Sequence, residues 1–250
     1  MHSENVVVET HGAVRVLRLM RPAKKNALTV DMYEALVAEL AAAEADDAIR
    51  VLRVTGAPGV FTAGNDIFDF MQRPPTSEDS AVVRLLFALL DFPKPLVASV
   101  EGHAVGFGTT ILLHCDLVLA AHGAQFRMPF VSLGLVPEAA SSVLLPGIVG
   151  LQRASEWLML GTVFGAEEAH AAGLVNRVVA PEALEEEAEK VAQALAAQPK
   201  EALRLTKKLI RGPLREATLA AFQREGAVFV ERLGSPEAME AFMAFAARRS

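Results

Sequence analysis

Short valine-rich segments alternate with segments of helical periodicity through the first 121 residues, and this alternation constrains the fold more than any other feature of the chain. Residues 6–9 and 14–19 predict two strands joined by a turn at His11-Gly12. Met32, Leu36 and Leu40 then share one face of a predicted helix that ends near residue 46. An alternation of this kind predicts an α/β architecture. Further strands are predicted at 51–55, 95–100 and 117–121, with helices at 80–92 and 106–114.

The second half of the chain has a different pattern. From residue 151 onward strand signals nearly disappear and helical patterns follow one another. The last predicted helix carries Met239 and Met243, more apolar surface than a free terminal helix normally exposes. We therefore expect a core over residues 1–195 and a helical extension over residues 196–250.

Charge and composition exclude several classes of function. The net charge of −6 argues against a nucleic-acid surface, and 52% hydrophobic residues suggest an apolar face hidden by self-association. No apolar run reaches the ~18 residues needed to span a bilayer, and the N-terminus lacks the pattern of a signal peptide, so we expect a cytoplasmic protein that does not bind membranes. The single cysteine, Cys115, has no clustered partner that would suggest a metal or a disulfide, and we expect it to be buried.

Glu138 is the only carboxylate in the apolar and glycine-bearing stretch 126–142. An acid among hydrophobes suggests proton transfer, because desolvation raises its pKa toward neutral pH. The alternative is structural, since Pro137-Glu138 also fits the first turn of a helix, where the helix dipole would lower that pKa. The sequence leaves open which influence prevails.

Two glycine-bearing loops, residues 61–67 and 102–108, follow predicted strands. Ligands bind at the carboxyl edge of open α/β sheets, and small residues let a backbone N–H approach a substrate oxygen. One N–H from each loop could therefore form an oxyanion hole. Neither loop gives a dinucleotide or P-loop fingerprint, so plain turns are the remaining alternative.

These motifs, taken in order, resemble the crotonase superfamily of enoyl-CoA hydratases and isomerases. The resemblance rests on Phe61-Thr62-Ala63-Gly64-Asn65-Asp66, the second loop and the Leu133-to-Gly147 stretch, and it runs from about Val6 to the C-terminus. It implies a core of repeated ββα turns forming a spiral, with a C-terminal helical region that trimerises. It also implies acyl-CoA thioester substrates, with coenzyme A as part of the substrate, no separate cofactor or metal, and a homotrimer or dimer of trimers.

The resemblance also implies catalytic residues. The N–H groups of Ala63 and Phe107 would form the oxyanion hole. The two glutamates of typical hydratases fall on Thr110 and Phe130, neither of which can activate water. The stretch ending in Pro137-Glu138 is instead similar to Δ3,Δ2-enoyl-CoA isomerases, in which the corresponding glutamate is the base. We expect an isomerase that moves a double bond between C3 and C2 through an enolate, with hydration or non-catalytic acyl-CoA binding as alternatives.

Further residues are expected around this centre. Phe68, Phe70 and Met71 could line an acyl tunnel, although such a cluster is also typical of a core. Lys24 could meet a phosphate of coenzyme A or be a solvated lysine. Phe242 falls where related proteins cover coenzyme A from a neighbouring subunit. The complete predicted substrate-binding set is Lys24, Ala27, Gly64, Asn65, Asp66, Ile67, Phe68, Met71, Gly106, Thr110 and Phe130.

Overall fold

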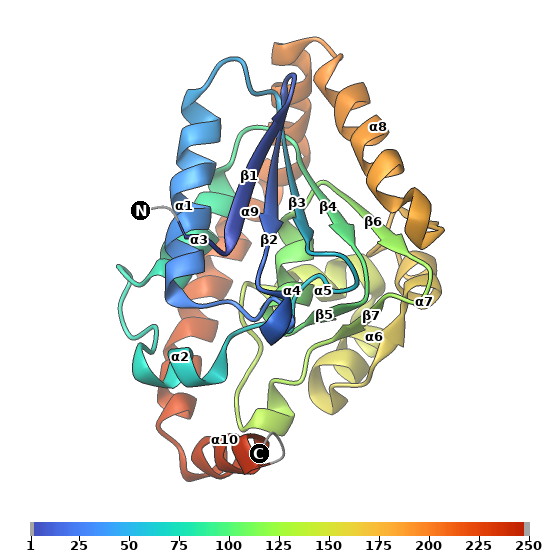
Figure 1. Ribbon diagram of the computed structural model, residues 1–250. Coiled ribbons are helices and arrows are strands. Elements are labelled where there is room, and N and C mark those ends of the chain that lie inside the picture. The colour runs from blue at the N-terminus through green and yellow to red at the C-terminus, as the bar shows by residue number, and fades with distance from the viewer. Residues whose placement is uncertain (1–2, 248–250) are drawn as a thin grey trace.

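The structure, a computed structural model, describes residues 3–247 and contains two β-sheets enclosed by helices (Figure 1). The larger sheet has six strands in the order β1-β2-β3-β4-β6-β9. β1 and β2 are antiparallel, and the other neighbouring pairs are parallel. The predicted α/β architecture is confirmed. The strands of this sheet are Val6–His11 (β1), Val14–Leu19 (β2), Val51–Gly56 (β3), Leu96–Val100 (β4), Leu117–Ala121 (β6) and Arg177–Val179 (β9).

The smaller sheet contains His103–Val105 (β5), Gln125–Arg127 (β7) and Phe164–Gly165 (β8), in the order β5-β7-β8. β5 directly follows β4 and β7 directly follows β6, so the chain passes from the larger sheet to the smaller one and then into a helix. These are the repeated ββα turns expected for the core.

The helices predicted in the first half of the chain are present except at one place, and the helix Ile67–Gln72 was not predicted. The predicted helix over residues 106–114 is a single α-helical turn continued by a 3₁₀-helix, Ile111–His114, because the chain must turn at Cys115 to enter β6. The α-helices are Val30–Ala45 (α1), Ile67–Gln72 (α2), Ala81–Asp91 (α3), Phe107–Thr110 (α4), Ser141–Val149 (α5), Leu151–Ser155 (α6), Ala166–Ala171 (α7), Leu184–Ala196 (α8), Lys200–Leu233 (α9) and Pro236–Ala247 (α10).

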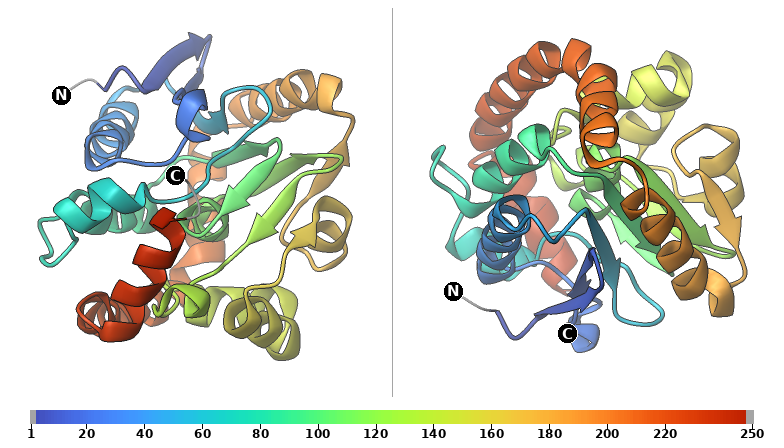
Figure 2. Two further views of the ribbon diagram at one scale, coloured as in Figure 1. Left: turned by 60° about the horizontal axis from the view of Figure 1, so that its bottom comes forward. Right: turned by 90° about the horizontal axis from the view of Figure 1, so that it is seen from above.

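Different helices cover the two faces of the larger sheet. Side chains alternate between the two faces along each strand. Val14 and Val16 of β2 therefore pack with α8, whereas Leu17 and Leu19 point to the other face and belong to the larger hydrophobic cluster, which is the main core. The main core also takes in α1, α3 and the second half of α9. Figure 2 shows α8 and the long helix α9 on opposite sides of the sheet. The glycine-bearing loops lie on the side of the main core.

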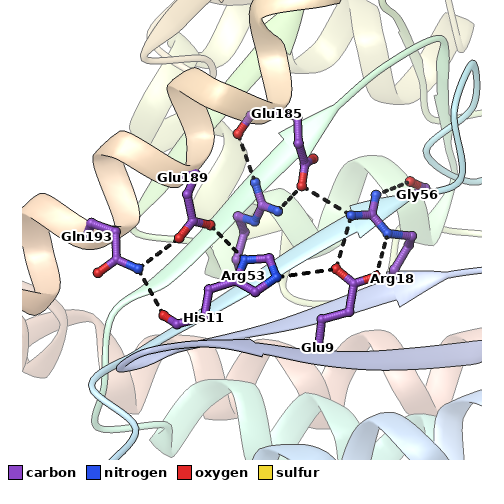
Figure 3. A network of polar contacts seen from close by, with 8 residues as sticks. All are labelled: Glu9, His11, Arg18, Arg53, Gly56, Glu185, Glu189 and Gln193. Carbon is purple, nitrogen blue, oxygen red and sulfur yellow. Dashed lines mark hydrogen bonds and ion pairs between the residues drawn. The ribbon is translucent and has the colours of Figure 1, made fainter.

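A buried arginine fixes the position of α8. Arg53 of β3 has no exposed surface, and its guanidinium donates to the carboxylate of Glu185 and, at 3.3 Å, to the Glu185 carbonyl oxygen (Figure 3). Glu185, in the first turn of α8, also accepts from Arg18 of β2 at 3.1 Å. Because a buried cation without a partner is costly, this pairing ties the start of α8 to the middle of the sheet.

The C-terminal region packs on the rest of the chain. Ala221, Phe222 and Phe229 of α9 belong to the main core, and α9 continues into α10 through a short turn. The helical region expected after residue 196 is therefore present. The proposed domain boundary at 195/196 coincides with the end of α8 and stays a prediction.

The remaining features concern membranes, metals and the cysteine. Within residues 3–247, no helix has both the length and the apolar character needed to cross a membrane. In the same range, no three His, Cys, Asp or Glu side chains gather as a metal site would require. Cys115 is buried, as expected, and burial raises the pKa of its thiol to about 12.

Candidate active site

The first glycine-bearing loop follows β3 and lies against the second. Thr62 N–H donates to His103 O at 2.9 Å, and Val105 N–H donates to Thr62 O at 3.0 Å. Gly64 has a φ of +83°, and a β-carbon there would lie 2.5 Å from Val105 O. Only glycine allows this close approach of two backbones. The two loops that the sequence predicted to share a site are in direct contact.

A buried asparagine holds the first loop in place. The Asn26 side chain donates to Val60 O at 2.8 Å and Phe61 O at 3.1 Å, and the backbone carbonyl of Asn26 accepts from the Thr62 hydroxyl at 2.7 Å. Its left-handed φ of +52° is one that asparagine adopts more readily than most residues. Sequence reasoning missed this role, because the partners are backbone carbonyls more than thirty positions away.

The amides of the first loop correct one prediction. Ala63 N–H donates to Lys25 O at 2.9 Å, so it is not free to bind a substrate oxygen. Within residues 3–247, the N–H of Asn65 has no protein acceptor, and the same holds for Phe107 N–H in the second loop. Phe107 is the first residue of α4, where amides lack an acceptor within the helix. The free pair of amides is therefore Asn65 and Phe107 in place of Ala63 and Phe107.

The second loop depends on two glycines. Gly106 has φ +56° and ψ −120°, a combination that is strained for residues with a β-carbon, and its N–H donates to Arg127 O at 2.8 Å. At Gly108, a β-carbon would lie 2.5 Å from Thr62 Cγ2. Gly106 is therefore required by its backbone conformation, whereas Gly108 is required by the close approach of the two loops.

Glu138 lies in the loop before α5, which begins at Ser141. The alternative that it forms the first turn of a helix is therefore wrong, because Ala139 and Ala140 turn into the left-handed region with φ of +59° and +57°. Thr110 Oγ1 donates to Glu138 Oε1 at 2.5 Å. Thr110 is fully buried, so it acts on Glu138 and does not line a cavity.

Burial decides the protonation of Glu138. Desolvation raises its pKa to about 8, and the negative charge of Glu225 adds to the increase, while the hydrogen bond from Thr110 lowers it. The question that the sequence left open is answered, since the apolar surroundings outweigh the opposing influence. A carboxyl group with this pKa can both accept and return a proton near neutral pH.

Two adjoining cavities meet at this centre. The first, of about 440 Å³, is lined by both glycine loops, including Asn65 and Phe107. The second, of about 400 Å³, lies between α3 and α9 and is lined by Glu138. Asn65, Phe70 and Phe229 line both cavities. The junction between the two cavities thus brings the carboxyl group and the loop amides to one place.

Most of the predicted substrate-binding residues line the first cavity. They are Ala27, Gly64, Asn65, Asp66, Ile67, Gly106 and Phe130. Asp66 also has structural partners, because its carboxylate accepts from Arg21 at 2.6 Å and caps α2. Lys24 is exposed and does not line the cavity.

Two of the aromatic or methionine assignments need correction, those of Phe68 and Met71. Phe68 and Met71 are 54% and 53% exposed and line neither of the two cavities, because the register of α2 turns Phe70 inward and these two side chains outward. Phe242 of α10 is buried and lines the first cavity of its own chain. Along the short helix α2, a residue that lines the cavities therefore lies between residues that face the surface. The sequence alone did not show which of these side chains would point inward.

The geometry supports one kind of chemistry. The two free amides in the first cavity can bind an oxygen that gains negative charge. Glu138, a carboxyl group of raised pKa, lines the adjoining second cavity, which is mainly apolar. This arrangement can remove a proton beside a carbonyl group and return it elsewhere on the same molecule.

Comparison with known proteins agrees with this chemistry. A model of the family described as enoyl-CoA hydratase/isomerase matches residues 9–250. The rat protein called enoyl-CoA delta isomerase 2 is 35% identical over 253 residues, covering 99% of this chain and 64% of the relative. This chain therefore spans less than two thirds of that relative's length.

Two further relatives match over nearly their whole length. A probable enoyl-CoA hydratase of Rhizobium meliloti is 33% identical, covering 100% of this chain and 97% of the relative. The solved structure of Pseudomonas aeruginosa OdaA superposes with a TM-score of 0.94 at 45% identity, covering 97% of this chain and 99% of that one.

Proposed function

The chain belongs to the enoyl-CoA hydratase/isomerase family, and on that premise we propose that it moves a double bond between C3 and C2 of an acyl-CoA thioester. Glu138 takes a proton from C2 and returns it to C4. One base is sufficient for such a 1,3-shift. The curated relatives called delta isomerases support this choice, although a relative called a hydratase has similar identity.

The observation that carries the proposal is the state of the carboxyl groups at the junction. Glu138 has the Thr110 hydroxyl as its side-chain partner and a pKa of about 8. Glu225, which lines the same cavity, already accepts from two backbone amides. The two positions at which the sequence resemblance places hydratase glutamates hold Thr110 and Phe130. Because two backbone amides already occupy the carboxylate of Glu225, Glu138 is the base available beside the loop amides, and a single base there favours proton transfer within the substrate over addition of water.

The amides of Asn65 and Phe107 stabilise the enolate. The thioester oxygen lies between them and gains negative charge as the C2 proton leaves, so the amides bind the transition state more tightly than the ground state. Removal of one such donor typically costs about 2.7–4 kcal/mol of transition-state stabilisation. The acyl chain then extends past Glu138 into the second cavity, whose walls include Leu86 and Phe87 of α3.

The coenzyme A portion occupies the outer part of the first cavity. Ala27 lines this cavity, and Lys24 and Lys25 are exposed in the same segment. A lysine there meets a phosphate group as a point charge.

We also propose that the chain forms a homotrimer or a dimer of trimers. Leu205, Leu209 and Ile210 of α9 are exposed large apolar side chains, as are Met159 and Leu160 near α6. Apolar surface of this extent favours burial in an oligomer. Light scattering of the purified protein tests the stoichiometry, and a monomer at micromolar concentration would refute it.

Substitution of the base tests the reaction. Glu138→Gln should lower isomerisation of a 3-enoyl-CoA by about 10²–10⁴-fold while leaving coenzyme A binding intact. Glu78→Gln is the matched control, because Glu78 is an exposed carboxylate lining the same cavity. Unchanged turnover in Glu138→Gln refutes the assignment.

Solvent deuterium separates the alternatives. The wild-type protein should incorporate deuterium at C2 and C4 of enoyl-CoA substrates. Hydration of crotonyl-CoA that is faster than isomerisation would favour a hydratase. Tight thioester binding without any exchange would favour a non-catalytic binder.

A further inference from the structure

Glu225 of α9 is a buried carboxylate that has no role in the proton transfer described above. Its Oε2 accepts from Ala140 N–H at 2.7 Å, and its Oε1 accepts from Ser142 N–H at 2.9 Å. Hydrogen bonds from amides to an ionised carboxylate are short and strong. Ala140 and Ser142 lie two and four positions after Glu138 in the chain. A single side chain of α9 thus holds the segment that presents the proposed base.

That segment is strained. Ala139 and Ala140 are consecutive residues in the left-handed region, where the β-carbon crowds the following carbonyl oxygen. Such a conformation persists only where surrounding contacts hold it. Glu225 supplies the contacts to the amides, and His114 supplies a second kind, because its Nε2 lies 2.9 Å from Ala139 O. Burial lowers the pKa of His114 to about 4, so this imidazole stays neutral and donates to that oxygen.

We propose that Glu225 is a positioning residue for the isomerase reaction, which holds the left-handed turn of Ala139 and Ala140 and thereby aims the Glu138 carboxylate at the junction of the two cavities. This inference rests on the proposed function of Glu138. The hydrogen bond between Glu225 and Ala140 spans 85 residues of sequence, so it links the long helix α9 to the reacting centre. Loss of the link lets the turn relax and moves the base away from C2.

The charge of Glu225 has a second effect, on protonation. Three polar groups interact electrostatically with Glu138. Thr110 of α4 and Glu225 of α9 shift the pKa of Glu138, and the charge of Glu138 adds to the increase that burial causes in the pKa of Tyr33 of α1. Desolvation is the largest cause of the raised pKa of Glu138. The hydroxyl of Thr110 lowers this pKa, and the charge of Glu225 raises it. Burial raises the pKa of Glu225 itself, whereas its hydrogen bonds with Ser142 and Ala140 and the positive charge of Arg224 lower that pKa and so favour the charged carboxylate. Neutralising Glu225 therefore shifts the pH at which Glu138 ionises to a lower value.

Two substitutions separate geometry from charge. Glu225→Gln removes the charge and replaces one acceptor by a donor that opposes a backbone N–H. Glu225→Asp keeps the charge but is too short to reach both amides. Thr218→Val is the control on the same helix, because Thr218 is buried and its hydroxyl donates only within α9, to Leu214 O.

The measurements are kcat and KM for a 3-enoyl-CoA across pH, together with thermal unfolding. Both Glu225 variants should lose kcat by about 10²-fold, the usual effect of a small misplacement of a reacting group, with KM changed by less than about 3-fold. The pH midpoint of kcat/KM should fall in Glu225→Gln and stay near the wild-type value in Glu225→Asp. Thr218→Val should keep wild-type kinetics whatever its melting temperature.

The outcomes that overturn the inference are specific. A kcat in Glu225→Asp equal to that of the wild type would overturn the positioning role of Glu225. If Glu225→Gln does not fold, the kinetics of Glu225→Asp alone test this role. An equal loss of kcat in Thr218→Val would also overturn it, since the effect would then follow stability. Activity that survives in Glu138→Gln instead refutes the proposed function, whereas an inactive Glu138→Gln beside fully active Glu225 variants refutes this inference alone.

Discussion

The hydroxyl of Thr110 donates a 2.5 Å hydrogen bond to the carboxylate of Glu138. By the sequence resemblance, Thr110 stands where hydratases of the family carry a glutamate. The chain thus has a neutral hydrogen-bond donor in place of one acid, and that donor serves the acid that remains. A bond of this length to the ionised form favours the carboxylate and opposes the desolvation that keeps it protonated.

The hydrogen bond from Thr110 should set the pH range of activity. Thr110→Val removes the hydroxyl, so the pKa of Glu138 should rise further, because Thr110 lowers it. A hydrogen bond to a charged group contributes ~1.5–3 kcal/mol, so we expect about a 10-fold loss of kcat/KM at pH 7. The pH midpoint should move upward. Thr110→Ser, which keeps the hydroxyl, should retain activity within a few-fold, and equal profiles for the two variants would contradict the role.

The wild-type enzyme should become more active as the pH rises through about 8. Glu138 must be ionised to accept the C2 proton, and its pKa in the free enzyme is about 8. The measurement is kcat/KM for isomerisation between pH 5.5 and 9.5 in buffers of constant ionic strength. Activity that is already constant above pH 6 would show that Glu138 is not the titrating base.

Glu138 should also reduce stability at alkaline pH. Its pKa is raised from 4.5 to about 8, so the stability associated with its protonated form is fully present below pH 4.5 and is lost as the pH rises through 8. Glu138→Gln should therefore gain stability relative to the wild type across this window, on the order of a few kcal/mol. Urea unfolding at pH 5 and pH 8.5 measures the difference in free energy of unfolding between Glu138→Gln and the wild type. The same difference at both pH values would contradict the raised pKa of Glu138.

Gly64 should be essential because of what its β-carbon would meet. Gly64→Ala places that carbon 2.5 Å from Val105 O, which displaces the loop that carries the Asn65 amide. We expect kcat/KM to fall by about 10²-fold. Gly12→Ala is the matched control, because Gly12 also has a positive φ but has open space around it. Both variants introduce backbone strain at a positive φ, but only Gly64→Ala introduces a steric clash. A loss of kcat/KM in Gly64→Ala alone, measured by steady-state kinetics, would therefore be due to the clash in the loop that carries the Asn65 amide.

The network under α8 should affect stability without affecting catalysis. Glu185→Ala leaves the guanidinium of Arg53 buried without its carboxylate partner, so the free energy of unfolding should fall by ~1–3 kcal/mol. Glu186→Ala, at the next and exposed position, should change it by less than about 0.5 kcal/mol. Both should keep wild-type kcat, since Arg53 contacts α8 and not the cavities. Urea unfolding and kinetics of the two variants provide the check.

Several features of this protein followed from its sequence. The alternation of valine-rich segments with helical patterns predicted the α/β architecture and most of the order of elements along the chain, because local periodicity reflects which face of an element is buried. The glycines at 64 and 102 marked two loops in which backbones approach closely. Glu138 stood out as the one acid in an apolar stretch.

Other features depended on contacts between distant parts of the chain. The N–H of Ala63 is occupied by Lys25 O, so the free amide is that of Asn65, and no local pattern distinguishes the two. Phe70 faces the cavity while Phe68 and Met71 do not, because the packing of α2 fixes its rotation. The sequence determined the order of elements and where chemistry could occur. The tertiary structure alone decided which amides are free and how far the pKa of Glu138 rises, because hydrogen-bond partners and desolvation come from residues that are close only in space.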